Sequence, residues 1–361
     1  MEPLKNLFDE NLIEQLSDSI LKHYPKFDKQ QFSKDIFFDG WENLELKERM
    51  RHTVICLNNN LGLNFKDSLK ILKKIAPSFN NFTAMVFPDF VEVYGLNNYS
   101  ESIKTLEYFT QYSSSEFAIR QFILKYPERT MEQMLSWSKH KNYHVRRLSS
   151  EGCRPRLPWS VALPDFKKDP SLILPILTNL INDESEYVRK SAANNLNDIS
   201  KDNSQITLDF TKKWIGKSKN IDWILKHGNR TLLKKGNHES LKLFGTSNNV
   251  KVELIDFSIH NEQIKIGETN TFSFDIKLKE SKPQKVRLEY EIDFVKSSGK
   301  TSKKIFKISE SKLKSNEKKT VTKKHNFKDY STRKHFPGKH KISIIINGKK
   351  YAEGSFSLVK N

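Results

Sequence analysis

A short proline-rich segment carries the side chains in this sequence that are best suited to chemistry. Residues 151–166 read EGCRPRLPWSVALPDF, so Trp159 is flanked by Arg154 and Arg156. Three prolines disfavour a long helix, and the tryptophan is therefore expected in a rigid, non-helical connection. An indole face attracts a cation and guanidinium groups bind phosphates, which makes this segment a candidate functional loop. The alternative is that Trp159 packs between helices.

Two acidic residues are candidates for catalysis, although each also has an ordinary structural explanation. Ser113-x-x-Glu116 has the spacing of a capping box at a helix N-terminus. Glu116 also precedes Arg120 by four residues, which is the spacing of a helical salt bridge. Asp198 falls on a polar strip of a helix whose buried face would hold Val188. Residue type and spacing alone favour a structural role for both acids.

The sequence lacks the short motifs that mark several large enzyme classes. It contains no GxxxxGK[ST], GxGxxG, HExxH or GxSxG pattern, which argues against P-loop NTPases, dinucleotide-binding enzymes, zincins and α/β-hydrolases. Cys56 and Cys153 form neither a CxxC motif nor a Cys/His cluster, so no disulfide scaffold and no zinc site are expected. His140 and His144 lack further ligands nearby and are expected on the surface. We therefore expect no metal and no cofactor.

The 361-residue chain is strongly basic, with 62 Lys and Arg against 43 Asp and Glu and a formal net charge of +19. Residues 251–361 hold 26 basic residues, nearly all lysines, and 13 acidic ones. This charge predicts a polyanionic partner, although the lysine-rich part could also be a solvated surface. A hydrophobic content of 36% argues against global disorder. No run of 18 apolar residues and no signal peptide is present, so the protein is expected to be soluble and cytoplasmic.

Helical spacing and internal repetition dominate residues 1–245. Tyr143-His-Val-Arg-Arg147 and Glu186-Tyr-Val-Arg-Lys190 are the same phrase, and their Val-Arg pairs are 43 residues apart. A repeat of this length with two helices is typical of HEAT and armadillo solenoids, whose inner helices line a concave surface. The valine of each phrase is expected in the core, and the basic residues after it are expected to bind phosphates. The alternative is that these arginines only make ion pairs within the stack.

Apolar and polar residues alternate beyond residue 250, which predicts strands. Asn347-Gly348 between two such runs is typical of a type I′ hairpin. About seven short strands in this length fit an immunoglobulin-like sandwich, and residues 245–249 are a plausible linker. The sequence therefore predicts a multidomain protein, with an all-α HEAT-like repeat solenoid at residues 1–245 and an all-β immunoglobulin-like sandwich at residues 250–361.

The helical part resembles the HEAT-like-repeat DNA glycosylases of the AlkC/AlkD family, and its AlkC members in particular. The phrases that carry the resemblance are Ser115-Glu-Phe-Ala-Ile-Arg120, Val145-Arg-Arg-Leu-Ser-Ser-Glu-Gly-Cys-Arg-Pro-Arg-Leu-Pro-Trp159, Tyr187-Val-Arg-Lys-Ser-Ala-Ala-Asn-Asn-Leu-Asn-Asp-Ile199 and Arg230-Thr-Leu-Leu-Lys-Lys-Gly236. The second phrase is long, unusual and therefore specific. Gln121 departs from the pattern, since a proline is expected there. Some AlkC members also carry a C-terminal immunoglobulin-like domain, which would cover the rest of the chain.

This resemblance implies excision of cationic alkylated bases, 3-methyladenine and 3-methylcytosine, from duplex DNA in base excision repair, without flipping the base into a pocket. It implies Glu116, Trp159 and Asp198 as the catalytic set, and so overrides their structural explanations. The candidates for contacts with DNA are Arg120, Arg147, Arg154, Arg156, Arg189, Lys190, Arg230, Lys234 and Lys235.

The expected partner is double-stranded DNA with alkylated bases, bound by a monomer associated with the bacterial nucleoid. Two other classes of function remain open at this point. One is a non-catalytic HEAT-repeat protein that binds damaged or branched nucleic acid. The other is a protein-interaction scaffold, which the basic charge disfavours.

Overall fold

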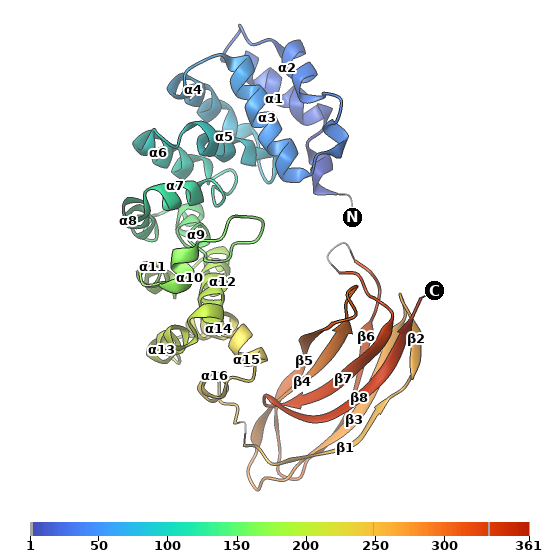
Figure 1. The fold of residues 1–361 in the computed structure, drawn as a ribbon. Helices are drawn as coiled ribbons and strands as arrows, with labels where there is room; N and C mark the ends of the chain where they lie inside the picture. Colours follow the sequence, from blue (N-terminus) through green and yellow to red (C-terminus); the bar gives the residue numbers. More distant parts are fainter. Residues whose placement is uncertain (1–2, 248, 331–332, 361) are drawn as a thin grey trace. The chain divides into compact units, whose positions relative to one another are not determined.

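Figure 1 shows the computed structural model of the chain, which describes residues 3–247, 249–330 and 333–360. Helices fill the N-terminal part and strands the C-terminal part, as the change of period predicts. Of the predicted linker at 245–249, Asn248 lies outside the described residues. Contacts group the chain into two compact units, Met1–Asn203 with Gly216–Gly228 and Ser204–Ile215 with Asn229–Asn361. The predicted domain boundary near residue 245 stays a prediction.

The first unit is a stack of helices. Its elements are η1 (Leu4–Leu7), α1 (Glu10–Leu21), α2 (Lys29–Ile36), η2 (Trp41–Asn43), α3 (Leu46–Leu61), α4 (Phe65–Ile75), η3 (Ala76–Ser78), η4 (Thr83–Met85), α5 (Val86–Tyr94), α6 (Tyr99–Phe109), α7 (Ile119–Lys125), α8 (Pro127–Trp137), α9 (Tyr143–Glu151), α10 (Pro164–Lys168), α11 (Leu174–Leu180), α12 (Glu186–Asp202) and α14 (Lys219–Gly228). Helices α8 and α11 pack together, and α9, α12 and α14 form a second row beside them. This arrangement is the predicted HEAT-like solenoid.

The two repeated phrases begin equivalent helices of that second row, α9 and α12. Val145 and Val188 are completely buried, as predicted. The side chain of Asn142 accepts a hydrogen bond from the His144 amide and so caps α9. Corresponding residues of the two phrases therefore occupy equivalent positions on two helices that pack against each other.

The described residues of the second unit form three helices and a β-sandwich. Its elements are α13 (Ser204–Trp214), α15 (Arg230–Lys234), α16 (His238–Leu243), β1 (Val252–Ile259), β2 (Gln263–Lys265), β3 (Thr269–Leu278), β4 (Gln284–Val295), β5 (Thr301–Leu313), β6 (Lys318–Asn326), β7 (Gly338–Ile346) and β8 (Lys349–Val359). One sheet has the order β1-β3-β6 and the other β2-β8-β7-β4-β5. All pairings are antiparallel except that of β2 with β8.

The sandwich core consists of the alternating apolar residues of its long strands. Phe272 and Phe274 of β3 face Leu288, Tyr290 and further apolar residues of β4 and β7. The predicted hairpin turn joins β7 to β8, where φ is 47° at Asn347 and 81° at Gly348, as a type I′ turn requires. The described residues form eight strands rather than about seven, because β2 is a short extra edge strand.

A search of the described residues for a helix long and apolar enough to cross a membrane finds none.

Candidate active site

A cavity of about 460 Å³ opens in the first unit beside Trp159. Most of its walls come from three segments: the loop between α6 and α7, the side of α9 that carries His144, Arg147 and Glu151, and the segment after α9. Its lining residues are Asn81, Phe82, Met85, Thr110, Tyr112, Ser113, Ser114, Glu116, Phe117, His144, Arg147, Glu151, Arg154, Leu157, Pro158, Trp159 and Tyr187. Of the predicted site residues, the fold thus brings together Glu116, Trp159, Arg147 and Arg154.

Trp159 lies on a non-helical connection between α9 and α10, residues 152–163, which we call the Trp159 loop. Its ring is 61% exposed and so does not pack between helices. The ring centroid lies 6.3 Å from that of Phe82, and Lys47 Nζ donates a hydrogen bond to the Trp159 carbonyl at 2.9 Å. Trp159 has a left-handed backbone with φ of 62°, which is unfavourable for a bulky residue. The exposed ring is therefore available to a ligand.

The capping box predicted for Ser113 and Glu116 is not formed. Helix α7 begins only at Ile119, three residues after Glu116. Ser113 Oγ instead donates to the carbonyl of Asn81 at 2.7 Å. This bond ties the α6–α7 loop to the segment before η4, so Glu116 is left to face the cavity.

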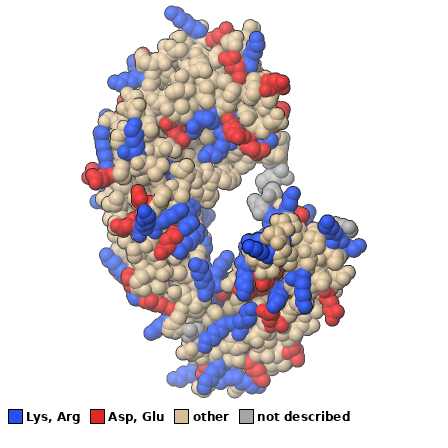
Figure 2. Space-filling view, viewed as in Figure 1, with Lys and Arg blue, Asp and Glu red and all other residues tan. Residues whose placement is uncertain are grey.

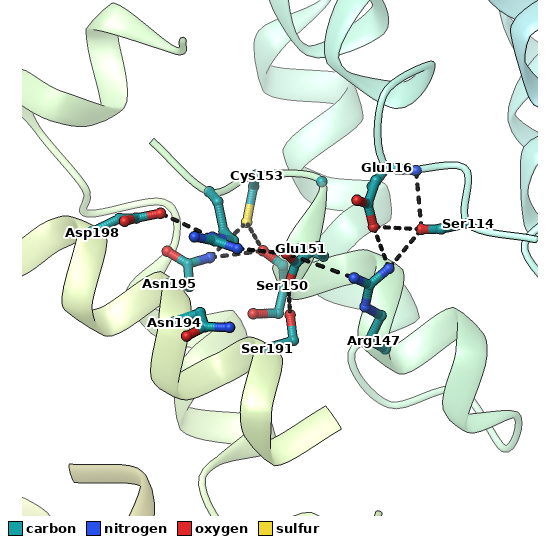
Figure 3. A network of polar contacts seen from close by, with 12 residues as sticks. Ser114, Glu116, Arg147, Ser150, Glu151, Cys153, Ser191, Asn194, Asn195 and Asp198 are labelled. Atoms are coloured by element: carbon teal, nitrogen blue, oxygen red, sulfur yellow. Dashed lines mark hydrogen bonds and ion pairs between the residues drawn. The ribbon is translucent and has the colours of Figure 1, made fainter. Parts of the chain in front are cut away.

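Glu116 forms an ion pair with Arg147 of α9 rather than with Arg120. Ser114 Oγ donates to Glu116 Oε2 at 2.7 Å, and Arg147 Nη1 donates to both Ser114 and Glu116 (Figure 3). The alternative explanation of Glu116, a salt bridge with Arg120, is therefore not borne out. Glu116 is held on the cavity wall by a partner from the next helical repeat.

Glu151, the last residue of α9, is an acid of the cavity that the sequence reasoning missed. Its carboxylate accepts hydrogen bonds from Arg154 Nη1 and from Ser191 Oγ, both at 2.6 Å. Arg147 Nη2 lies 3.6 Å from Glu151 Oε1. The available signal was the four-residue spacing from Arg147, which places both side chains on one strip of the helix.

Asp198 of α12 lies beside the site but does not line the cavity. It is 1% exposed, and its oxygens accept from Arg154 Nε at 2.9 Å and from Lys201 Nζ at 2.8 Å. The Arg154 guanidinium also reaches Glu151, so it connects Asp198 to the cavity acids (Figure 3). A ligand in the cavity would meet Arg154 before it met Asp198.

The carboxylates of this network stabilise the charged state of its two arginines, Arg147 and Arg154. Burial lowers the pKa of Arg147, but the attraction of Glu116 and Glu151 outweighs it and leaves the pKa raised. The pKa of Arg154 is raised in the same way, since Glu151 and Asp198 outweigh its burial. The site therefore holds guanidinium groups paired with carboxylates near an exposed aromatic residue.

Arg120 is among the predicted DNA contacts, but its position in the structure does not fit that role. It is completely buried, and its guanidinium donates to the backbone carbonyls of Gly152, Arg154 and Val161. Burial lowers the pKa of Arg120 to about 10, so the group remains a cation at neutral pH. A side chain that is closed off from solvent in this way cannot reach a phosphate.

The basic residues of the repeated phrases divide into two kinds. Arg189 Nη1 donates to the carbonyls of Asp183 and Glu184, six and five residues before it. Arg146 makes the same two bonds to residues six and five before it in its own repeat. The arginine at this shared position thus bonds to the backbone of the turn before its helix, a structural role that neither sequence-based interpretation describes. Lys190, one residue further on, is exposed and pairs only at the surface with Glu186.

The remaining predicted contacts lie on exposed surfaces or in the second unit. Arg156 of the Trp159 loop is exposed and pairs with Asp202 through two hydrogen bonds of 2.9 and 2.6 Å. Arg230, Lys234 and Lys235 belong to α15 and its end, and both lysines are exposed. Figure 2 shows that Lys and Arg outnumber Asp and Glu on the visible face of the sandwich. The charge predicted for this part is therefore on the surface.

His144 lines the cavity, in contrast to the surface position predicted for it. It directly precedes Val145, and Tyr187 occupies the equivalent position before Val188 and also lines the cavity. Burial and, to a smaller extent, the charge of the nearby Arg147 lower the pKa of His144, so the ring is neutral at neutral pH. Arg147 lies over the Tyr187 ring at 4.7 Å. Equivalent positions of two repeats thus supply aromatic walls.

Within residues 3–247, 249–330 and 333–360, no three His, Cys, Asp or Glu side chains are grouped so that they could hold a metal ion.

Comparisons with known proteins cover both parts of the chain. A family model described as "DNA alkylation repair enzyme" matches residues 99–233, and one described as "Uncharacterised protein YhaZ, C-terminal Ig-like domain" matches residues 253–360. The uncharacterized protein YhaZ of Bacillus subtilis is 48% identical over 349 residues, which are 97% of each chain.

A solved structure shares the whole fold. It is the alkylpurine DNA glycosylase AlkC of Pseudomonas fluorescens bound to DNA containing an abasic site analog. That structure is 35% identical, with a TM-score of 0.96 over 99% of this chain and 100% of that chain. The first family model covers residues 99–233, which include both cavity acids, Glu116 and Glu151. The chain therefore belongs, with YhaZ, to the AlkC-type DNA alkylation repair family.

Proposed function

We propose that the protein is a DNA glycosylase that excises the cationic alkylated bases 3-methyladenine and 3-methylcytosine from duplex DNA in base excision repair. The observation that carries the proposal is the meeting of an exposed indole, Trp159, with two carboxylates, Glu116 and Glu151, in one cavity of a strongly basic protein. Carboxylates repel phosphates, so a surface that only bound DNA would not need them there. The likeness to AlkC over the full chain supports the same function.

The chemistry of such a base suits this site. A base alkylated on N3 is already a cation, so it can leave without a proton from a general acid. The enzyme must instead stabilise the oxocarbenium-like sugar that forms as the bond breaks. A carboxylate about 4 Å from that charge contributes roughly 4 kcal/mol at an effective dielectric constant near 20, or about three decades in rate. The face of an indole adds about 0.5–2 kcal/mol.

The geometry suggests which step of the reaction each side chain assists. Glu116 faces the cavity directly and stabilises the sugar, with Trp159 against the sugar face. Glu151 lies on the same wall and adds to the negative field. Asp198 orients the attacking water, which requires Arg154 to turn away from it, for example toward a phosphate. None of these steps requires the base to leave the stack, in line with the expectation that it is not flipped.

The exposed cations are proposed to hold the DNA backbone around the lesion. Arg156 and Lys190 flank the cavity residues in sequence, and Lys234 and Lys235 with the sandwich lysines attract the duplex more generally. Arg147 and Arg154 have the additional task of holding the acids. We propose that one copy of the chain acts on nucleoid DNA without a metal or cofactor.

Product analysis on methylated duplex DNA tests this proposal. With enzyme in excess, the protein is expected to release 3-methyladenine and 3-methylcytosine and to leave abasic sites. Trp159→Ala and Glu116→Gln are expected to lose most activity. The control Glu14→Gln changes an exposed acid that pairs with Lys29 and is expected to be fully active. Full activity in both site variants would refute the site assignment, and no abasic product from any alkylated substrate would refute the reaction.

The second candidate is a non-catalytic protein that binds damaged or branched nucleic acid. It is favoured by one observation, that Glu116 and Asp198 are each already paired with an arginine, as structural acids usually are. This candidate predicts salt-sensitive binding of methylated DNA with no release of any base. The same product analysis separates the two candidates.

A further inference from the structure

We propose that Arg120 is a positioning residue that holds the Trp159 loop in the conformation that presents the indole ring. The inference rests on the proposed function, because presenting the ring matters only if the ring meets the substrate. It concerns a residue that the sequence analysis placed among the DNA contacts. The structure instead places its guanidinium beneath the loop, out of reach of solvent.

The hydrogen bonds of Arg120 join the two ends of the loop. Nη1 donates to the carbonyl of Gly152 at 2.9 Å and to that of Arg154 at 2.8 Å. Nε donates to the carbonyl of Val161 at 2.9 Å, and Nη2 reaches the same oxygen. Trp159 lies between these two anchoring points. The planar fork of a guanidinium can serve both ends at once, which a lysine ammonium cannot do in the same geometry.

The burial of the Arg120 guanidinium indicates that its main role is to make these hydrogen bonds. Among the described residues Arg120 has no carboxylate as an ion-pair partner, and its acceptors are neutral carbonyls. A buried cation without a counter-charge is costly unless its donors are satisfied. A smaller neutral residue would avoid that cost but could not bridge the loop. The loop therefore depends on this arginine for its shape.

The loop needs such support because Trp159 does not hold itself in place. Its left-handed backbone is unfavourable for an aromatic residue, so the surroundings must impose it. The ring is mostly exposed and has Phe82 as a tilted neighbour 6.3 Å away. Outside the loop, Lys47 adds one further bond, to the Trp159 carbonyl. Arg120 thus bonds to both ends of the loop, and Lys47 bonds to the carbonyl of Trp159 itself.

Arg120 also links the indole to the acids. It holds the carbonyl of Arg154, whose side chain contacts Glu151 and Asp198. A shift of the loop would therefore move the ring and the acid network together. Misplacement of reacting groups by about 1 Å can cost a factor of about 10² in rate.

The first test follows the ring itself and does not depend on activity. The full chain is labelled with 5-fluorotryptophan, and the ¹⁹F resonance of Trp159 is assigned by its absence in Trp159→Phe. In Arg120→Lys this resonance is expected to shift or broaden while those of the other four tryptophans stay in place. The matched control Arg49→Lys, a buried arginine that donates to the carbonyls of Leu44 and Glu42, should leave it unchanged. An unchanged Trp159 resonance in Arg120→Lys would overturn the proposal.

The second test measures excision and DNA binding separately. Arg120→Lys is expected to lower the single-turnover rate by about 10²-fold with an unchanged Kd for DNA, since the lost function is positioning. In a Trp159→Ala background the same change should cost clearly less, because only its effect on the acid network remains. Equal losses in both backgrounds would show that Arg120 does not act through Trp159 and would overturn the proposal.

A variant at an exposed position keeps the proposal testable if Arg120→Lys fails to fold. Lys47→Met removes the exposed donor to the Trp159 carbonyl without burying an unpaired group, and should also move the Trp159 resonance. Lys70→Met, which changes an exposed lysine paired with Asp67, is its control. If the unaltered protein released no base, the proposed function would fail, whereas the resonance would still decide whether Arg120 positions the ring.

Discussion

Replacing Glu116 by glutamine removes one negative charge from the cavity wall and little else. The amide has nearly the same size and can still accept from Ser114 Oγ, but the ion pair with Arg147 is lost. If the developing sugar cation lies about 4 Å from the carboxylate, the lost attraction is about 4 kcal/mol at an effective dielectric constant near 20. We therefore expect single-turnover excision to slow by about 10³-fold.

Arg147 provides a check on this magnitude. Its guanidinium is paired with Glu116 and, if it lies about 7 Å from the same sugar, would repel the cation by about 2 kcal/mol. The double variant Glu116→Gln/Arg147→Met removes both contributions, so its net loss is about 2 kcal/mol, or about 30-fold in rate. The double variant is thus expected to be faster than Glu116→Gln alone.

The assay is release of 3-methyladenine from methylated duplex DNA with enzyme in excess over DNA. Thermal melting and the Kd for an abasic duplex are measured on the same preparations, so that losses of folding or binding are not counted as chemistry. A Glu116→Gln rate equal to that of the unaltered protein would refute the electrostatic reasoning. A double variant slower than the single one would show that Arg147 does more than oppose Glu116.

Three further predictions concern the second unit. Burial lowers the pKa of His325 to about 4, so the unfolded chain takes up the proton first as the pH falls from 6.5. The sandwich should therefore lose up to about 3 kcal/mol by pH 4, seen as faster hydrogen exchange in β4 and β6 that His325→Phe abolishes. Gly348→Ala would bring Cβ to 2.8 Å from the Cα of Gly236, so its melting temperature should fall more than that of Gly299→Ala, which has open space at a similar φ. Lys235→Gln should reduce the slope of log K against log salt by about 0.9, unlike Lys70→Gln.

Features that depend on neighbouring residues were predictable from the sequence. The buried valines of the repeated phrases follow from helical periodicity, and the Asn347-Gly348 turn follows from the positive φ that these residues tolerate. The non-helical path around Trp159 follows from the prolines of the segment, the last of which begins α10. These patterns fix local conformation whatever the rest of the chain does.

Features that depend on distant partners were not predictable in this way. Glu116 has the spacing of a capping box, but its actual partner is an arginine 31 residues further along the chain. Arg120 looks like a surface cation until three carbonyls, 32 to 41 residues away, are brought around it. Glu151 lies in the most specific phrase of the sequence, but the contact with Ser191 that helps to hold it comes from the next repeat, 40 residues away. The tertiary fold, and not the local pattern, decides these roles.

If Trp159 acts in excision as proposed, its left-handed backbone sets stability against activity at a single position. Asparagine tolerates that conformation, whereas an aromatic residue carries a penalty of roughly 1–2 kcal/mol there and regains little of it from an exposed ring. Selection for thermal tolerance alone would therefore favour Trp159→Asn, which would yield a more stable protein that lacks the indole. Engineering a heat-resistant form of this protein requires that every screen for melting temperature be paired with a screen for base release.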